Sequence, residues 1–391
     1  MPLDVCDSRI TSPDGSPRVG RVRPQLRRAW GTVRDGCVDF SDHRVDMGRS
    51  TPSQVLACVL AAVVAVACAG GADAPGRSGG TGVGGSGGAG SATAGNGSDD
   101  APPAESPDDE VAAPEVEQEA PDALPGGADG GEGGGSTDDL AVYYLDVGQG
   151  DATLLVHDEV AMLIDAGRWQ ASDVVPFLRS RGVESLDLVV ITHPHADHIG
   201  QFDQVMDAFD VEEVWWSGSA TTSQTFERSI AALERSDARY EEPRSGDVAS
   251  IGPLLLEVVN PPVGVDVGDL HDANLAVRIT YGEVRFLFTG DAERATEARM
   301  VAEVSTTLAA DILQLGHHGS RTSTTPAFLA AVDPSVAIYS AGDGNSYGHP
   351  HGSVLDRLRD AGVSTYGTDV HGSITVRTDG ATWTIGTERE E

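Results

Sequence analysis

The stretch that decides the fold of this chain is residues 186–198, which read Leu186-Asp187-Leu188-Val189-Val190-Ile191-Thr192-His193-Pro194-His195-Ala196-Asp197-His198. Its apolar first half predicts a buried strand, and the histidines and the second aspartate follow where that strand ends. Imidazole and carboxylate groups are the ligands that a zinc- or manganese-like ion takes when no thiolate is offered. The stretch therefore predicts a metal site on the loop behind a core strand. A His-rich surface turn without a ligand role is disfavoured, because acid and histidine motifs recur after later apolar runs.

The composition divides the 391-residue chain into unequal parts. Residues 69–139 contain no aromatic side chain and are dominated by Gly, Ala, Ser, Pro, Asp and Glu. Such a segment buries too little apolar surface to fold, which predicts a disordered acidic linker. Residues 140–391 are long enough for one sizeable globular core. All four cysteines precede the linker, so the globular part has neither disulfides nor thiolate metal ligands.

The charge balance of the chain bears on its substrates. The formal net charge is −35, and the chain contains no lysine. An acidic surface repels polyanions, which argues against tight, nonspecific binding of nucleic acid. Cleavage of a phosphodiester remains compatible with this charge, because bound cations reverse the field locally.

Residues 1–68 are interpreted as an upstream extension followed by a lipoprotein-type signal peptide, with Met47 as a candidate true start. Residues 55–68 form an apolar run too short to span a bilayer comfortably, as in the core of a signal peptide. Small residues before Cys68 resemble a bacterial lipobox, whose cysteine carries the lipid, although Ala65 stands where Leu or Val is usual. An ordinary secretory signal or an uncleaved anchor is the alternative. Each interpretation predicts an extracytoplasmic globular domain, and the lipobox adds a membrane anchor at Cys68.

The globular part alternates apolar strands with helices. One helix is expected from about Ser172, as its N-cap, to Arg181, where Gly182 stops it. Strand clusters with helices on both flanks predict an α/β (α+β) fold, a four-layer αββα sandwich in which two mixed sheets face each other. The expected strands are 140–145, 152–156, 160–164, 186–191, 211–216, 254–259, 275–280, 284–288, 311–315, 336–339, 373–377 and 381–385. The other expected helices are 199–209, 222–236, one that ends near 304, and 352–361.

Several motifs at predicted strand ends together resemble the metallo-β-lactamase fold superfamily. They are Asp165 after an apolar strand, His193-x-His195-x-Asp197-His198, Thr289-Gly290-Asp291 and Gly316-His317-His318-Gly319. The runs at 145–151 and 345–350 are similar to the extracytoplasmic hydrolase domain of ComEC-type competence proteins and their stand-alone relatives. The resemblance covers about 140–387, and this combination of motifs is highly specific.

The resemblance implies two divalent metal ions, zinc or manganese, held by these motifs. The implied ligands are His193 and His195 for the first ion, Asp197, His198 and His318 for the second, and Asp291 as the bridge between both. His317 is the alternative to His318, which is favoured because its following glycine matches the last superfamily motif.

One position departs from the superfamily pattern. Members usually carry another histidine ahead of the Gly-Asp motif, where this chain has Asn260. Asparagine ligates weakly, so the first site is expected to be weak or filled by manganese or another oxygen-tolerant ion. His271, in a nearby loop rich in Gly and Asp, is the alternative donor.

Other polar residues are expected around the ions. Asp165 is expected to brace the His-rich loop by hydrogen bonds without touching metal. Gln149 and Asp151 lie in a Gly-rich turn that the fold places at the rim, where Asp151 would orient a metal-bound water or a ligand histidine. His349 is expected near the metals, where it would protonate a leaving oxygen; the alternative is that it only caps helix 352–361.

Together these features predict an exported, membrane-tethered, metal-dependent hydrolase that cleaves phosphodiesters, with DNA among the candidates, by a metal-bound hydroxide. Asp197 or Asp291 would receive the proton of the nucleophile, and His349 would serve the leaving group. The alternatives are a hydrolase of another ester or lactam class and a noncatalytic, metal-containing envelope binding module, because a fold does not settle chemistry. The expected partners are the ester or phosphodiester substrate and the membrane, and no protein partner is inferred.

Overall fold

The computed structural model describes residues 31–34, 37–39 and 139–390. The predicted signal peptide with Cys68, and all of the predicted linker before residue 139, lie outside the described residues. Within the described ranges, no helix is both long enough and apolar enough to cross a membrane.

The first half of the globular part is built on an eight-stranded sheet with the order β10-β9-β7-β5-β4-β3-β18-β19. Its central strands β5 (Val160–Ile164), β7 (Leu188–Ile191) and β9 (Glu213–Trp216) run parallel. The remaining strands of this sheet are β3 (Leu140–Tyr144), β4 (Thr153–His157), β10 (Arg239–Glu241), β18 (Ile374–Thr378) and β19 (Trp383–Thr387).

The second half is built on a nine-stranded sheet with the order β17-β16-β15-β14-β13-β12-β11-β1-β2. Its parallel part holds β14 (Val284–Phe288), β15 (Ile312–Gln314), β16 (Val336–Tyr339) and β17 (Ser364–Gly367). The antiparallel part holds β11 (Asp247–Ile251), β12 (Leu254–Asn260), β13 (Ala276–Tyr281), β1 (Gly31–Arg34) and β2 (Cys37–Asp39). A separate short pair joins β6 (Ser185–Leu186) to β8 (Asp210–Val211).

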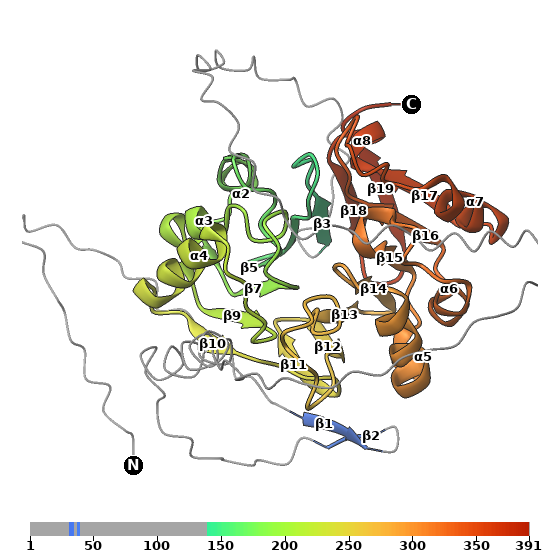
Figure 1. Ribbon diagram of the computed structural model, residues 1–391, viewed down its shortest axis with the longest axis horizontal. Helices are drawn as coiled ribbons and strands as arrows, with labels where there is room; N and C mark the ends of the chain where they lie inside the picture. Colours follow the sequence, from blue (N-terminus) through green and yellow to red (C-terminus); the bar gives the residue numbers. More distant parts are fainter. Residues whose placement is uncertain (1–30, 35–36, 40–138, 391) are drawn as a thin grey trace, which may run out of the picture. The chain divides into compact units, whose positions relative to one another are not determined.

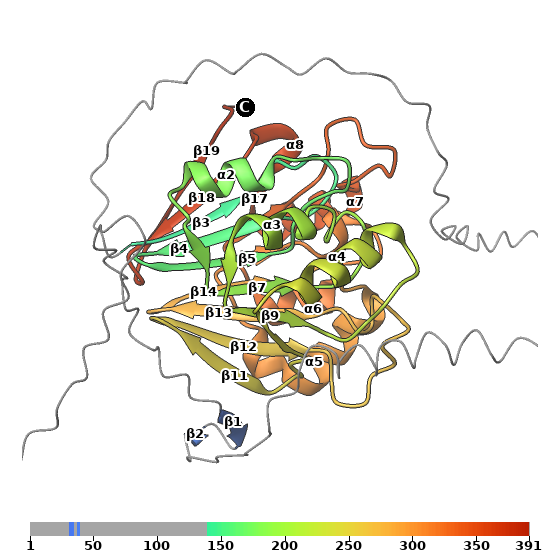
Figure 2. The ribbon, with the colours of Figure 1, turned by 90° about the vertical axis from the view of Figure 1, so that its left-hand side faces the viewer.

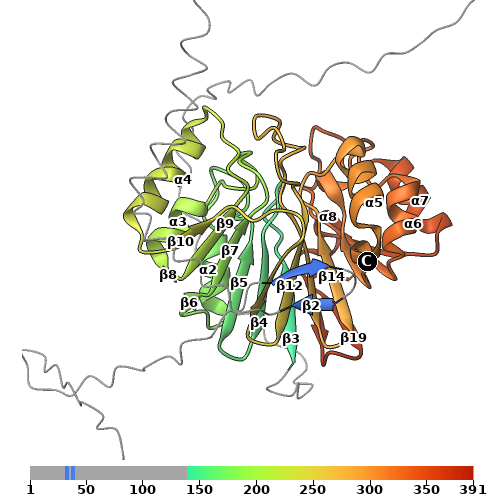
Figure 3. The ribbon, with the colours of Figure 1, turned by 90° about the horizontal axis from the view of Figure 1, so that it is seen from below.

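Helices cover the outer face of each sheet, which confirms the predicted four-layer αββα sandwich (Figures 1 and 3). In Figure 2 the helices of the first half lie in front of their sheet. Helices of the first half are α2 (Val174–Ser180), α3 (Phe202–Ala208) and α4 (Gln224–Arg235). Helices of the second half are α5 (Arg294–Leu308), α6 (Pro326–Val332), α7 (Gly352–Asp360) and the short α8 (Thr368–His371).

The alternation of side chains along β3 shows how the strands serve two apolar layers. Leu140, Val142 and Tyr144 join the core between the sheets, whereas Ala141 and Tyr143 pack with the side chains under α2, α3 and α4. This period of two is what a strand with both faces buried requires. The two sheets are therefore fixed face to face, and the loops at their ends are held in register.

Two features of the fold differ from the sequence-based expectations. Ser172 is not a helix cap: α2 begins at Val174, whose N–H donates to the Gln201 side chain at 3.0 Å. The strands β1, β2, β10, β11 and β17 and the helices α6 and α8 were not expected, although α6 has a clear start signal. The Thr325 hydroxyl there accepts from the Phe328 N–H at 3.3 Å, and a proline follows the cap.

Candidate metal centre

The His-rich loop follows β7 directly and is fixed by one buried carboxylate. Asp165, at the end of the neighbouring strand β5, accepts from the Thr192 N–H at 2.9 Å and from the Thr192 hydroxyl at 2.8 Å. Its Oδ2 also lies 2.8 Å from His198 Nδ1. A carboxylate on Nδ1 holds a proton there, so Nε2 is the ring nitrogen of His198 that is available to a metal ion.

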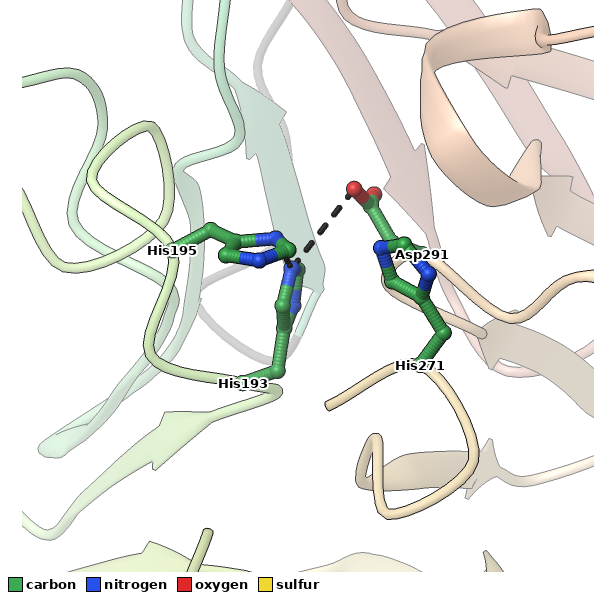
Figure 4. Close-up of side chains that lie close together, drawn as sticks. All are labelled: His193, His195, His271 and Asp291. Atoms are coloured by element: carbon green, nitrogen blue, oxygen red, sulfur yellow. Dashed lines mark hydrogen bonds and ion pairs between the residues drawn. The ribbon is translucent and has the colours of Figure 1, made fainter. Parts of the chain in front are cut away.

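A first donor group contains three imidazoles and one carboxylate. One ligand atom each of His193, His195, His271 and Asp291 lies within 4.8 Å of all the others (Figure 4). His193 Nε2 is 3.6 Å from Asp291 Oδ2. His193 is fully buried and His195 partly so. Three histidines and a carboxylate are a donor set that fits a zinc- or manganese-like ion.

Asn260 is not part of this group, and the structure places His271 there instead. The Asn260 amide nitrogen donates to the carbonyl oxygens of Asp272 at 3.1 Å and Asn274 at 2.5 Å. Its Oδ1 accepts from Arg299 at 3.1 Å. Both polar atoms of this side chain are therefore engaged in the protein, and Asn260 belongs to neither donor group. His271, which the sequence offers as the alternative donor, stands with His193 and His195 in its place.

A second donor group lies beside the first. It contains Asp197, His198 and His318, with His318 Nε2 3.2 Å from Asp197 Oδ2 and His198 Nε2 3.9 Å from Asp197 Oδ1. Asp291 faces both groups. Its Oδ1 lies 3.3 Å from His198 Nε2, whereas its Oδ2 points to His193 of the first group. This is the placement that a bridging carboxylate requires.

Unpaired buried atoms mark the same place. His198 Nε2 and Asp291 Oδ1 are buried and have no hydrogen-bond partner among the described residues. Buried polar atoms are nearly always paired, and leaving one unpaired costs about 1–3 kcal/mol. Both atoms are acceptors when the His198 ring is neutral, so at 3.3 Å they require either a proton or a metal ion between them. The residues present therefore fit a divalent metal ion.

The two histidines after β15 have different surroundings. His318 Nδ1 donates to the Ser340 carbonyl at 2.9 Å, and its Nε2 lies 3.2 Å from Asp197 Oδ2. His317 points its Nδ1 to Glu293 at 3.1 Å, and its Nε2 lies 3.7 Å from Asp291 Oδ2. His318, and not His317, therefore stands with the second donor group.

The Gly-rich turn after β3 lies behind the second donor group. Asp151 is buried, and its Oδ1 lies 3.6 Å from His318 Nδ1. The Gln149 Oε1 accepts from the Gly342 N–H at 3.2 Å, so this side chain anchors the loop after β16. A Cβ at Gly150 would collide with the Asp197 carbonyl oxygen, which explains why glycine is required there.

His349 lies beside the two histidines that follow β15. Its ring centroid is 5.4 Å from that of His317 and 6.1 Å from that of His318. Asn345 fixes this loop, because its Oδ1 accepts from the His349 N–H at 3.0 Å and its amide donates to the His349 carbonyl at 2.5 Å. The N-cap of α7 is His351, so His349 does not cap that helix.

The carboxylates set the protonation of the cluster. Burial disfavours the charged form of His198, but the charges of Asp291, Asp165 and Asp197 outweigh it and raise its pKa well above the usual value. The pKa of His318 is raised in the same way against burial, chiefly by Asp291. Burial opposes ionisation of Asp291, yet the surrounding histidines hold its pKa well below the usual range. The centre is thus built to hold positive charge.

The pKa of His349 is shifted in the opposite direction from that of His198 and His318. Burial, followed by the charges on His318, His317 and His351, lowers its pKa to about 4. At neutral pH the ring is uncharged and offers one N–H as a hydrogen-bond donor.

These features place the chain in a known class. Residues 145–343 match the family described as the metallo-beta-lactamase superfamily, and the chain belongs to it. Its relatives include ComE operon protein 3 of Bacillus subtilis, which is 30% identical over 255 residues, covering 60% of this chain and 33% of that protein. Competence protein ComA of Neisseria gonorrhoeae is 29% identical over 238 residues, covering 60% of this chain and 32% of that protein.

The chain spans about a third of the length of these curated relatives. They confirm the resemblance to the ComEC-type hydrolase domain. Among solved structures, the metallo-beta-lactamase fold protein YhfI from Bacillus subtilis is 14% identical with a TM-score of 0.40, covering 62% of this chain and all of that one.

Proposed function

We propose that the globular part is a phosphodiesterase that uses two divalent metal ions, zinc or manganese. The observation that carries the proposal is the position of Asp291, whose two oxygens face two separate donor groups. The first ion would be held by His193, His195, His271 and Asp291, and the second by Asp197, His198, His318 and Asp291. When bound, two such metal ions supply the Lewis acidity that activates water and stabilises charge on a phosphoryl group.

The residues around the centre then have distinct tasks. Asp197 is the least buried of the clustered carboxylates, with a side chain 32% exposed against 2% for Asp291. Burial opposes its ionisation, but His198 and His318 lower its pKa, so it is a carboxylate that can take a proton from an attacking water. His349 is neutral and donates its ring N–H to the leaving oxygen. Asp165 keeps the His198 lone pair directed at the site.

The choice of a phosphodiester, with DNA among the candidates, is supported by the names of the relatives. One is named Competence protein ComA and another ComE operon protein 3, and a third is Recombination protein 2 of Haemophilus influenzae, 30% identical over 244 residues. We extend this to an extracytoplasmic location in the cell envelope, through the signal peptide and the lipid anchor at Cys68 that the sequence predicts. Because the protein is acidic, it is expected not to bind tightly along a DNA duplex. Ends or short segments of DNA that reach the metal centre are the favoured substrates.

The alternative is a binding module whose ions have only a structural role. The unpaired buried atoms at His198 and Asp291 and the partly exposed Asp197 speak against it, because a structural site closes all its coordination positions within the protein.

The experiment is a turnover assay with bis(p-nitrophenyl) phosphate and with linear DNA, each with added manganese or zinc. We expect hydrolysis that requires metal and is lost in His195→Ala. Metal binding without turnover of any ester in a panel of phosphodiesters, lactams and thioesters would instead support the binding module.

A further inference from the structure

The loop between β12 and β13 brings a histidine to the first donor group from outside the strand-end motifs. His271 lies in this loop, and its ring centroid is 5.2 Å from that of His195 and 6.0 Å from that of His193. The loop is long and polar, with several Gly and Asp residues. A loop of this composition does not fix a side chain by itself, because ordering each residue costs about 1–2 kcal/mol of backbone entropy. Something else in the fold must hold His271.

A clamp of partly buried hydrogen bonds does so, and we define it as Asn260, Asp272, Thr296 and Arg299. Arg299 on α5 donates from one terminal nitrogen to Asn260 Oδ1 at 3.1 Å and to the Asp272 carbonyl at 2.9 Å. Its other terminal nitrogen lies 3.3 Å from Asp272 Oδ1. The Thr296 hydroxyl donates to the same Oδ1 at 2.7 Å. The residue that follows His271 is thus held at both its backbone and its side chain.

The clamp continues into the metal centre. Asn260 donates to the Asn274 carbonyl, and Asn274 Oδ1 in turn accepts from the Asp291 N–H at 3.1 Å. The Leu275 N–H donates to the Thr192 carbonyl at 2.7 Å. The segment that carries His271 is therefore bonded to the loops of both the bridging carboxylate and the His-rich motif.

We propose that Arg299 and Asn260 are positioning residues that build the first metal site by fixing His271 as its third histidine ligand. Asn260 holds the loop in place of ligating, and the ligand comes from eleven residues further along the chain. The inference rests on the proposed function only through the two-ion centre, not through any substrate.

Because Arg299 and Thr296 lie on α5, the first metal site depends on this helix more than the second does. The second donor group is supplied by loops directly behind β7 and β15, so loss of the clamp leaves it in place. Loss of a residue that orients a metal ligand typically weakens metal affinity about 10- to 100-fold. That weakening is expected chiefly for the first ion, since His271 is a donor to that ion only.

The test is a cobalt titration of the metal-free full chain, followed by visible absorbance and by metal content per chain after dialysis. We expect the wild type to bind two ions and His271→Ala to bind one. Arg299→Gln and Asn260→Ala should still bind two ions, but the first ion should bind at least about tenfold less tightly than it does to the wild type. Arg359→Gln, which removes an exposed arginine on α7, is the matched control and should titrate as wild type. Retention of the other ion with its wild-type spectrum shows that each variant is folded.

Two results would overturn the inference. One is a His271→Ala chain that still binds two ions with wild-type affinity. The other is an Arg299→Gln chain that titrates like Arg359→Gln. If the wild-type chain binds two ions but cleaves no phosphodiester, the proposed function is wrong and the inference about the clamp is unaffected. If the wild type binds fewer than two ions, both are wrong.

Discussion

The Asp165→Asn substitution tests whether one buried carboxylate prepares the metal centre. Asp165 is 1% exposed and accepts three hydrogen bonds, two from Thr192 and one from His198 Nδ1. The asparagine amide has only one oxygen, so it cannot accept all three of these hydrogen bonds. If the oxygen keeps the Thr192 N–H, the NH₂ group faces His198, which must then carry its proton on Nε2. The lone pair that points to the site is lost.

The magnitude follows from these bonds. One hydrogen bond to a charged group contributes about 1.5–3 kcal/mol, so the free energy of unfolding of the metal-free protein should fall by about that amount. Loss of the orienting partner of a ligand histidine should weaken binding of the second ion about 10- to 100-fold. Urea unfolding measures the first effect, and competition with a chromogenic chelator measures the second.

Asp187→Asn is the matched control. Asp187 is also buried and accepts from a backbone N–H at 2.9 Å, that of Ala161, but it lies outside both donor groups. It should lower stability without changing metal affinity. Equal metal affinity in Asp165→Asn and Asp187→Asn would refute the orienting role of Asp165.

Three further predictions concern the same centre. Because the carboxylates raise the pKa of His198 and His318, the metal-free protein holds protons on these histidines at pH 7. Metal binding releases these protons, so the metal affinity falls as the pH falls. Calorimetry of metal binding in buffers of different protonation heat detects the release, and its absence would contradict this prediction. Gly150→Ala should lose metal and stability together, because the added methyl group meets the Asp197 carbonyl, and metal analysis beside thermal unfolding would contradict this if both stayed unchanged. His349→Ala should keep both ions and lower kcat about 10²- to 10³-fold, because the leaving oxygen loses its N–H donor; an unchanged kcat would remove His349 from the reaction.

The fold could be predicted because its signals are local. Apolar runs and breakers placed most strands and helices of the sandwich within a few residues. The strand β10 was missed because only Tyr240 in it is not charged, and its place depends on pairing with β9. Helix α6 was missed although Thr325 and Pro326 form an ordinary helix start. Short elements that are held by tertiary contacts leave little periodicity in the sequence.

The candidate centre could be predicted as far as its residues lie at strand ends. The His-rich loop and Asp291 stand directly after apolar strands, and the carboxyl ends of parallel strands gather at one edge. His271 follows no strand. Its place depends on Arg299, which lies on a helix 28 residues further along and shows no motif. A long-range hydrogen-bond network of this kind leaves no local pattern, so His271 could be named from the sequence only as an alternative donor.

The most direct test of the central claim is anomalous diffraction at the zinc edge from crystals of the zinc-loaded chain. The account predicts two peaks that share Asp291, one beside His193, His195 and His271 and the other beside Asp197, His198 and His318. A single peak, or peaks that do not share Asp291, would contradict a two-ion centre. The proposed chemistry would then have no basis.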